Sequence, residues 1–367
     1  MKVLVIDDAV SFRSQIKKML NMIDGIEVVG SASNGKIAID MLQHQDIDLI
    51  ILDLNMPVMG GLETIEEMRR LGLKQKIIVF ASKSSRSARD TVTALSLGAN
   101  DFVLKPEGIA ANLDAVLEQV RAELEPRIIQ FIPKKNDIKL DNNNHQSKEE
   151  NSNQLTQTPQ YKPAFRNVNI DIFTPKIIVI ASSTGGPKAL EVFFSKLTSP
   201  PTVPILVAQH MPETFTKFLA QRIAKITGIN CREAKNGEFL NPGIVYIAPG
   251  NFHMKVTETN TGPAILLDQG PRVNSVRPAA DLLFSSATKV FGSQCLGFVL
   301  TGMGQDGCLG SYEIKKNGGV IMIQDQKSST VWGMPGEVHQ RGYYDKIGSL
   351  EQCCEFLTEK AINRKVA

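Results

Sequence analysis

The twelve residues Lys176-Ile-Ile-Val-Ile-Ala-Ser-Ser-Thr-Gly-Gly-Pro187 combine the signals of a buried strand, a turn and the start of a helix. The apolar run from Ile177 to Ala181 is typical of a strand that is buried on both faces of a parallel sheet. The two glycines and Pro187 favour a tight turn that leads into a helix. The stretch therefore predicts an α/β fold, with three hydroxyl side chains at the carboxyl end of a strand.

Similar apolar runs follow in the second half of the chain, and segments with helical periodicity separate many of them. The runs are Ile205–Ala208, Val245–Ala248, Leu296–Leu300 and Val320–Ile323. Buried strands that alternate with helices are the pattern of a mainly parallel sheet covered by helices. We expect this half to form one α/β domain over residues 173–363.

The first third of the chain shows a shorter version of the same alternation. Its apolar runs are Val3–Ile6, Glu27–Gly30, Leu49–Leu52, Ile77–Phe80 and Phe102–Leu104. Five strands separated by helical segments predict a doubly wound (βα)5 domain over residues 1–124. Functional side chains are expected at the carboxyl ends of the first, third, fourth and fifth strands.

Asparagine and glutamine dominate the region between the two domains, where they fill ten of the 25 positions from 136 to 160. So polar a segment cannot bury enough apolar surface to offset the conformational entropy of the chain. We therefore predict a flexible linker over residues 125–172, and this linker contains His145.

The bulk composition narrows the class of protein. A chain of 367 residues with 42% hydrophobic residues is long enough for two buried cores. Its net charge of +3, without a dense Lys/Arg block, gives little support for a nucleic-acid or membrane surface. The five cysteines form no C-x-x-C pair, and no apolar stretch is long enough to span a bilayer. We expect a cytoplasmic protein that binds no nucleic acid and does not insert into membranes.

Three aspartates of the first domain are predicted to meet at one edge of its sheet. Asp7 and Asp8 end the first strand and Asp53 ends the third. One isolated aspartate is usually a solvated loop or cap residue, but three converging carboxylates suit a hard divalent cation such as Mg²⁺. Asp53 would then be a nucleophile for a phosphoryl group, with Ser82 and Lys105 as contacts to the phosphoryl oxygens.

These residues and their neighbours resemble the receiver domains of two-component response regulators. The motifs that carry the resemblance are Asp7-Asp8, Asp53-Leu-Asn-Met-Pro57, Ser82 and Phe102-Val-Leu-Lys105-Pro106, the last of which also suggests a cis bond before Pro106. The resemblance implies that Asp53 takes a phosphoryl group from a histidine kinase. It also implies Mg²⁺ ligands at Asp7, Asp8, Asp53 and the Asn55 carbonyl, with Ser82 and Phe102 as switch residues. Gly60 departs from the Asp or Asn that receivers often carry there.

The second domain holds the residue types that serine catalysis needs. The hydroxyl requires a base within hydrogen-bond reach, a group that orients the base, and donors for the oxyanion. Ser183, His210 and Asp306 each follow a different predicted strand. Because parallel strands end at one edge of their sheet, the three side chains are expected to converge.

Other interpretations of these residues remain open. Ser183 or Thr184 is also suited to cap the following helix, and the adjacent glycines are suited to cradle a phosphate. His253 is a rival base and Asp281 a rival acid. His339 has the character of an exposed or structural helix residue.

Taken together, the motifs of the second domain resemble the chemotaxis protein-glutamate methylesterase family, known as CheB. They are Ile180-Ala-Ser-Ser-Thr-Gly-Gly186, Gln209-His-Met-Pro212, Tyr246-Ile-Ala-Pro-Gly250 with His253, Arg277-Pro278, Leu300-Thr-Gly-Met-Gly-Gln-Asp-Gly307 and Gly333-Met-Pro335. The resemblance implies that Ser183 is the nucleophile, His210 the general base and Asp306 the orienting carboxylate. It implies oxyanion contacts from the backbone near Thr184 and Met303. Ser275 and Val276 depart from the histidines that the family often has there.

The resemblance also implies an activity and its control. Members of the family hydrolyse glutamate methyl esters on chemoreceptors, without a cofactor for the hydrolysis, and also deamidate receptor glutamines in chemotactic adaptation. The unphosphorylated receiver covers the catalytic site, and phosphorylation by the chemotaxis histidine kinase loosens this packing. A flexible tether that is longer than the span it must bridge lowers the effective concentration of the receiver at the catalytic site. Because the predicted linker over residues 125–172 is long, we expect weaker autoinhibition.

A transcription regulator and a phosphorylation-gated interaction protein are the two alternatives to the methylesterase. A transcription regulator would need a DNA-binding output domain, but the second domain lacks a basic recognition-helix pattern. A phosphorylation-gated interaction protein with a degenerate site would not need Ser183, His210 and Asp306, and all three residues are present. The sequence therefore favours the hydrolase.

Overall fold

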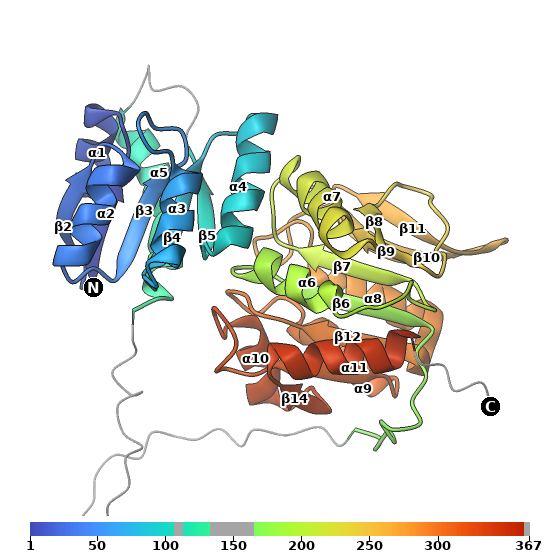
Figure 1. Cartoon of the computed structure of the whole chain (residues 1–367). Coiled ribbons are helices and arrows are strands. Elements are labelled where there is room, and N and C mark those ends of the chain that lie inside the picture. Colours follow the sequence, from blue (N-terminus) through green and yellow to red (C-terminus); the bar gives the residue numbers. More distant parts are fainter. Residues whose placement is uncertain (106–112, 133–164, 363–367) are drawn as a thin grey trace, which may run out of the picture.

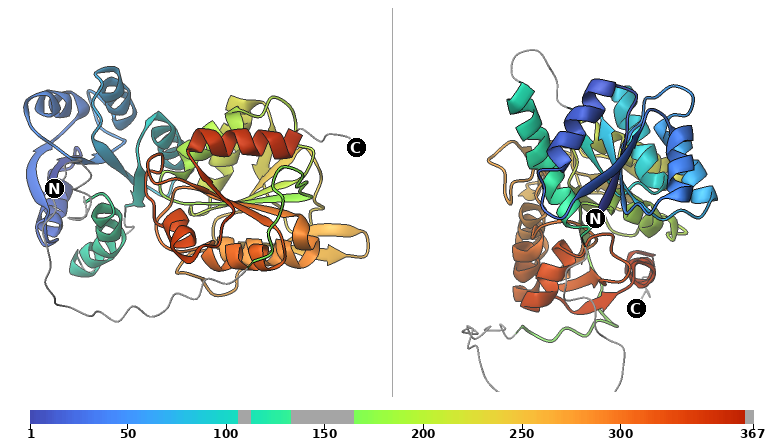
Figure 2. Two further views of the ribbon diagram at one scale, coloured as in Figure 1. Left: turned by 90° about the horizontal axis from the view of Figure 1, so that it is seen from below. Right: turned by 90° about the vertical axis from the view of Figure 1, so that its left-hand side faces the viewer.

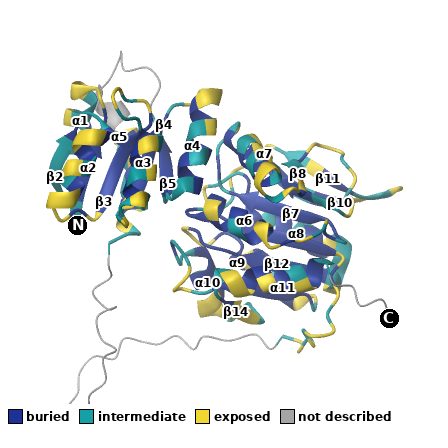
Figure 3. Ribbon diagram, in the orientation of Figure 1, coloured by how far each residue is buried: buried dark blue, intermediate teal, exposed yellow. Residues whose placement is uncertain are grey.

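The computed structural model describes residues 1–105, 113–132 and 165–362, with the backbone alone at 113–117. The chain forms two α/β units that lie side by side (Figure 1). Strands and core-facing helix positions are buried in both units (Figure 3). The two-unit α/β organisation expected from the sequence is confirmed. In the described part of the chain, no helix is both long and apolar enough to cross a membrane.

The N-terminal unit is a five-stranded parallel sheet with helices on both faces. Its strands are β1 (Lys2–Ile6), β2 (Glu27–Ala32), β3 (Leu49–Asp53), β4 (Lys76–Ala81) and β5 (Asp101–Leu104), in the spatial order β2-β1-β3-β4-β5. Its helices are α1 (Val10–Leu20), α2 (Gly35–His44), α3 (Gly61–Arg70), α4 (Ser85–Leu97) and α5 (Leu113–Ile129). Helices α1 and α5 share one apolar cluster with the sheet, and the other three helices cover the opposite face.

The C-terminal unit is built on a seven-stranded sheet in which every neighbouring pair is parallel. The spatial order is β14-β13-β12-β6-β7-β9-β8. The strands are β6 (Ile177–Ser182), β7 (Ile205–Gln209), β8 (Asn230–Glu233), β9 (Ile244–Ile247), β12 (Cys295–Val299), β13 (Val320–Gln324) and β14 (Lys346–Gly348). An antiparallel hairpin of β10 (His253–Thr259) and β11 (Gly262–Asp268) extends from this unit.

Helices cover both faces of the C-terminal sheet (Figure 2). Helices α6 (Gly186–Ser195), α7 (Phe215–Thr227) and α11 (Leu350–Ile362) pack on one face. Helices α8 (Ala280–Phe291), α9 (Cys308–Lys316) and α10 (Met334–Arg341) pack on the other face, and a 3-10 turn, η1 (Gly292–Gln294), follows α8. Because both faces are covered, the central strands are continuous apolar runs, which is why the sequence pattern identified them.

Three elements of the C-terminal unit were not predicted, namely the strands β8 and β14 and the β10–β11 hairpin. Strands β8 and β14 lie at the two edges of the sheet and contain polar residues, so neither one is an apolar run. In the hairpin, buried and partly exposed positions alternate along β10, because one side of the ribbon faces the unit. An alternating pattern is a weaker signal than a fully buried strand.

The described structure continues into both ends of the predicted linker. Helix α5 runs on to Ile129, five residues past the expected boundary, and Ile128 is fully buried beneath the N-terminal sheet. On the other side, Val168, Ile170 and Phe173 pack against the apolar cluster that includes α11. Residues 133–164, with His145, lie outside the described residues, as does the predicted cis bond at Pro106.

The segment from Phe165 to Pro175 forms a strap on the C-terminal unit. Lys360 of α11 donates from Nζ to the carbonyl oxygens of Ile170, at 2.7 Å, and of Asp171, at 3.3 Å. Lys360 is only 8% exposed, and these two carbonyls together with the Glu359 carboxylate, at 2.9 Å, compensate its lost hydration. The apolar residues and this ammonium fix the strap as part of the folded unit.

Two isoleucines of the strap provide a matched test of this packing. Ile170 contacts the core, whereas Ile172 is 76% exposed. Ile170→Ala is expected to lower the free energy of unfolding of the C-terminal unit by about 1–3 kcal/mol, and Ile172→Ala by less than about 0.5 kcal/mol. Urea unfolding of the intact protein measures both values. Equal values for the two variants would show that the strap is not part of the folded unit.

Candidate active site

Three adjacent strands of the C-terminal sheet end at the same edge, and the predicted catalytic residues follow them. Ser183 comes directly after β6, His210 directly after β7, and Asp306 lies in the loop between β12 and α9. Strand β6 lies between β7 and β12, so the chain builds the sheet outward on both sides of β6. Such a switch in strand order is where open α/β sheets place their ligand sites.

A buried side chain that the sequence analysis missed, Gln209, fixes the turn after β6. Its Oε1 accepts from Ser182 Oγ at 2.6 Å, and its Nε2 donates to the carbonyl of Ser183 at 3.0 Å. A Cβ at Gly186 would lie 2.0 Å from this Oε1, so the turn admits only glycine there. Gln209 therefore holds the Ser182 side chain and the Ser183 carbonyl, next to the Ser183 side chain. Its position beside His210 in the sequence was the available signal.

His210 and Asp306 form a direct pair. His210 Nε2 lies 2.7 Å from Asp306 Oδ2, and the two side chains are 10% and 2% exposed. An ionised Asp306 makes Nε2 the donor of this bond, so Nδ1 is the basic ring nitrogen. The His210 backbone N–H donates to the carbonyl of Ser182 at 3.0 Å, which sets the imidazole and Ser183 at neighbouring positions of paired strands.

The Asp306 carboxylate accepts further hydrogen bonds from the first turn of α8 and the turn before it. The N–H of Ala280 donates to Oδ2 at 2.6 Å, and the N–H of Asp281 donates to Oδ1 at 3.1 Å. Asn274 Nδ2 also donates to Oδ1, at 3.1 Å. Burial alone raises the pKa of Asp306, but the bond and charge attraction of His210, with the two backbone donors, hold it below its ordinary value.

The two residues predicted to flank the oxyanion lie close to Ser183 in different ways. The hydroxyl of Thr184 donates to Asp101 of the N-terminal unit at 2.6 Å, so this hydroxyl is engaged at the contact between the units. Met303 is 38% exposed and follows Gly302. A Cβ at Gly302 would lie 2.8 Å from the Cβ of Ser183, which places the start of this loop against the serine.

The three alternative residues, His253, Asp281 and His339, lie outside the His210–Asp306 pair. His253 is 1% exposed on β10, and its Nε2 lies 2.9 Å from the carbonyl oxygen of Pro271. Asp281 lies beside Asp306 and binds no histidine among its described hydrogen bonds. His339 is exposed on α10 between the rings of Trp332 and Tyr344.

The helix-cap interpretation of the hydroxyls after β6 is wrong. The N-cap of α6 is Gly185, which has a φ of 76° and provides no side-chain cap. Neither Ser183 nor Thr184 therefore caps this helix.

The acidic residues of the N-terminal unit gather as expected. Ligand atoms of Asp7, Asp8 and Asp53 lie within 4.8 Å of one another. Lys105 Nζ is 2.9 Å from Asp7 Oδ2 and 2.9 Å from Asp53 Oδ2. Burial raises the pKa of Asp53, and the attraction of Lys105 opposes this effect only in part. Oxygen donors alone make this a site for a hard cation, and the residues present fit Mg²⁺.

The two switch positions lie on or next to β4 and β5, which are neighbouring strands of the N-terminal sheet. Ser82 follows β4, and its N–H donates to Ser87 Oγ at 3.0 Å. Phe102 of β5 stacks on Phe215 of α7, with the ring centroids 4.9 Å apart and the planes at 10°. The aromatic switch residue is therefore in direct contact with the C-terminal unit.

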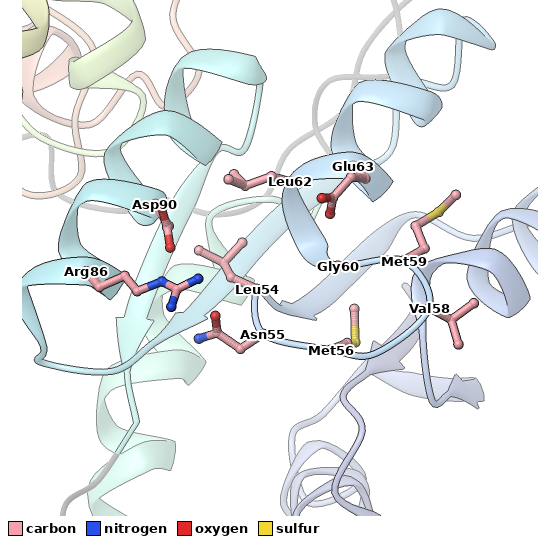
Figure 4. Close-up of a pocket in the computed structure, with 10 residues that line it drawn as sticks. All are labelled: Leu54, Asn55, Met56, Val58, Met59, Gly60, Leu62, Glu63, Arg86 and Asp90. Carbon is pink, nitrogen blue, oxygen red and sulfur yellow. The ribbon is translucent and has the colours of Figure 1, made fainter.

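A surface pocket of about 510 Å³ opens beside the acidic residues, between the β3–α3 loop and α4 (Figure 4). Its lining residues are Leu54, Asn55, Met56, Val58, Met59, Gly60, Leu62, Glu63, Arg86 and Asp90. Asn55 belongs both to this lining and to the predicted cation ligands. Val58 has a φ of 71°, a conformation that is strained for a β-branched residue. No motif in the sequence indicated this pocket.

The N-terminal unit contacts the turn that carries Ser183. Besides the bond from Thr184 to Asp101, the N–H of Gly185 donates to the carbonyl of Asn100 at 3.1 Å. Arg127 of α5 is 3.6 Å from the same Asp101 carboxylate. The start of β5 is therefore hydrogen-bonded to the two residues that follow the serine.

A buried polar group joins the helices of the two units. Glu191 of α6 accepts from Arg222 of α7 at 2.7 Å, and Ser96 of α4 is hydrogen-bonded to both residues. Nearby, the Arg89 guanidinium of α4 lies 5.1 Å from the centre of the Phe218 ring. Figure 1 shows α4 facing α6 and α7 across this junction. The contact thus combines an aromatic stack, a buried ion pair and backbone bonds.

Comparison with known families shows two matches. A family model described as CheB methylesterase matches residues 178–357. A model described as response regulator receiver domain matches residues 3–117. Together they cover most of the described structure, one in each unit.

Similar proteins match along nearly the whole chain. A protein-glutamate methylesterase/protein-glutamine glutaminase of Trichodesmium erythraeum is 37% identical, over 96% of this chain and 97% of its own length. One of Caulobacter vibrioides is 36% identical, over 98% of this chain and 99% of its own length. A crystal structure of the Thermotoga maritima CheB methylesterase catalytic domain is 39% identical and covers 51% of this chain and 98% of its own, with a TM-score of 0.49.

Proposed function

Because this chain belongs to the protein-glutamate methylesterase/protein-glutamine glutaminase family, with a receiver domain before the esterase domain, we propose that Ser183, His210 and Asp306 carry out its hydrolytic reaction. The observation that carries this assignment is the 2.7 Å bond between His210 and an Asp306 carboxylate whose ionised form is stabilised by four donors. The substrates are glutamate methyl esters on the cytoplasmic helices of chemoreceptors.

The reaction proceeds through an acyl-enzyme. Ser183 Oγ attacks the ester carbonyl while His210 takes its proton at Nδ1, and Asp306 stabilises the imidazolium at Nε2–H. The proton then passes to the methoxide, and methanol leaves. His210 next takes a proton from water, whose oxygen attacks the acyl carbonyl, and the serine and a free glutamate are released. With a glutamine substrate, the leaving group is ammonia and the other steps are the same.

The oxyanion that forms on the carbonyl needs donors on the far side from His210. We assign these to backbone N–H groups of Thr184 and Met303. The close approach of Gly302 to Ser183 supports a contribution from the adjacent loop.

Cys308, at the start of α9, is a poor alternative nucleophile. Burial raises the pKa of its thiol to about 11, so the thiol is protonated at neutral pH.

The receiver domain controls the esterase. Asp53 would accept a phosphoryl group from the chemotaxis histidine kinase, with Mg²⁺ held by Asp7, Asp8, Asp53 and the Asn55 carbonyl. When bound, this cation would supply positive charge that stabilises the transferring phosphoryl group. Lys105 contacts both Asp7 and Asp53, so a phosphoryl group on Asp53 would compete for this ammonium.

We expect phosphorylation to release the autoinhibition through β5, because the start of this strand contacts the C-terminal unit and Lys105 follows its end. Phe102 lies on β5, the strand that leads to Lys105, and it stacks on Phe215 of the C-terminal unit. If phosphorylation of Asp53 changed the orientation of the Phe102 ring, the stack on Phe215 would weaken. The adjacent bond between Asp101 and Thr184 would weaken with it. The receiver would then leave the turn that carries Ser183, and a receptor helix would reach the serine.

The activity assay uses methylated chemoreceptor membranes. Methanol release by the wild-type protein is expected to rise with a small-molecule phosphodonor such as acetyl phosphate. Ser183→Ala should abolish the release, and Asp306→Asn should reduce it about 10²–10⁴-fold because the imidazolium loses its charged partner. Release that persists in Ser183→Ala would reject the assigned nucleophile.

The junction between the units is tested by two arginines of α4. Arg89→Ala removes the contact with Phe218, worth about 0.5–1 kcal/mol, so release without phosphodonor is expected to rise about 2–5-fold. Arg86 lines the pocket on the receiver instead, so Arg86→Ala serves as the matched control and should leave basal release unchanged. If both variants behave alike, the junction does not limit the activity.

A further inference from the structure

Two buried carboxylates at the active site share a single amide group. Asn274 Nδ2 donates to Asp306 Oδ1 at 3.1 Å and to Asp281 Oδ2 at 2.9 Å. Asp306 and Asp281 are 2% and 7% exposed, so water does not screen their repulsion. The two hydrogens of this amide therefore bridge the two carboxylates.

The backbone around Asn274 is folded to present this amide. Val273 and Val276 exchange backbone hydrogen bonds of 3.2 and 3.0 Å, which closes a two-residue hairpin turn. Asn274 and Ser275 are the two central residues and have φ values of 52° and 64°. Positive φ at both central positions is the type I′ arrangement, in which asparagine is favoured. The turn thus fixes the direction of one polar side chain.

Asp281 holds the other side of the bridge. Its Oδ1 accepts from the N–H of Gly310 in α9 at 2.7 Å. A Cβ at Gly310 would lie 2.5 Å from the Cβ of Phe284, which shows how closely α9 approaches α8. Because Asp306 lies just before α9 and Gly310 lies in its first turn, Asp281 ties the start of α9 to the start of α8.

We infer that Asn274 is a positioning residue for the proposed hydrolysis, anchored by Asp281, and that it keeps Asp306 Oδ2 directed at His210. This inference rests on the proposed function. Without the amide, the carboxylates would face each other unbridged, and a proton shared between them would offset their repulsion. A protonated or rotated Asp306 would not stabilise the imidazolium.

The groups around Asp306 and Asp281 shift the pKa values of these two carboxyls in opposite directions. Burial raises the pKa of Asp281, and the charge of Asp306 raises it further, whereas the pKa of Asp306 is lowered. His210 faces the pair from β7, and the Cys308 thiol faces Asp281 from α9, near Arg341 and Glu337 of α10. Asp306 is thus the carboxylate that stays ionised, and Asp281 is the one that takes up a proton more readily.

The test measures the reaction of Ser183 with a small alkyl fluorophosphonate, in the full-length protein treated with phosphodonor. In this reaction Ser183 Oγ forms a bond to phosphorus, fluoride leaves, and His210 accepts the serine proton. The readout is the rate of modification at Ser183 as a function of pH and probe concentration, followed by mass spectrometry. It needs no receptor, so it is independent of the identity of the substrate.

Three variants separate the amide from the turn. Asn274→Gly keeps a residue that favours positive φ but removes the amide, and Asn274→Asp replaces the amide with a third carboxylate. Both are expected to slow the maximal rate about 10–100-fold without changing the probe affinity. The acid limb of the pH profile should move to higher pH, because a less stabilised Asp306 binds its proton more readily. Ser275→Gly, at the neighbouring position of the same turn, should behave as the wild type.

The outcomes distinguish a failure of the positioning role of Asn274 from a failure of the proposed function. Wild-type modification at Ser183 with an unchanged rate and pH profile in Asn274→Gly would overturn the positioning role alone. A change in probe affinity without a change in maximal rate would also overturn it, because that result indicates a substrate contact. Absence of modification at Ser183 in the wild type would overturn the proposed function, and this inference with it.

Discussion

The active site depends on an ionised carboxylate that is buried in the protein. Asp306 is 2% exposed, and such a charge is stable only when hydrogen bonds replace its lost hydration. Four donors do so, and they come from the end of β7, the turn before α8 and the first turn of α8. His210 and the residues around the start of α8 are far from Asp306 in the sequence, and only the folded sheet brings them together. The direction of the His210 ring is a consequence of that assembly.

The same edge of the sheet also explains how a second domain can control the site. The turn after β6 carries Ser183, and the two residues that follow the serine are bonded to Asp101 and Asn100 at the start of β5. Phe102 is the next residue and stacks on α7. A signal at Asp53 therefore has a short physical route to the serine, through neighbouring residues of one strand.

The sequence predicts most of what lies at strand ends and little of what lies between elements. Buried parallel strands are apolar runs, so their ends located Asp53, Ser183 and His210 without knowledge of any contact. Gln209 and Asn274 were missed because a buried amide has no distinctive sequence pattern. Their importance arises from partners that are distant in the chain.

The domain boundaries also could not be predicted fully from the sequence. The linker was predicted from its polar composition, but a few apolar residues near its ends pack onto the two units. Ile128 lies beneath the N-terminal sheet, and Ile170 lies against the core that includes α11. A compositional average over the segment conceals such residues, because packing depends on where each one lies and what it faces.

The most direct test of the account is whether an acyl-enzyme forms on Ser183. Hydroxylamine added during the hydrolysis of a methylated receptor peptide would compete with water for that intermediate. The account predicts a γ-glutamyl hydroxamate in place of part of the glutamate, with methanol released at an unchanged rate. Methanol release without enzyme-dependent hydroxamate, at hydroxylamine concentrations that compete with water, would indicate direct attack by water and contradict the account.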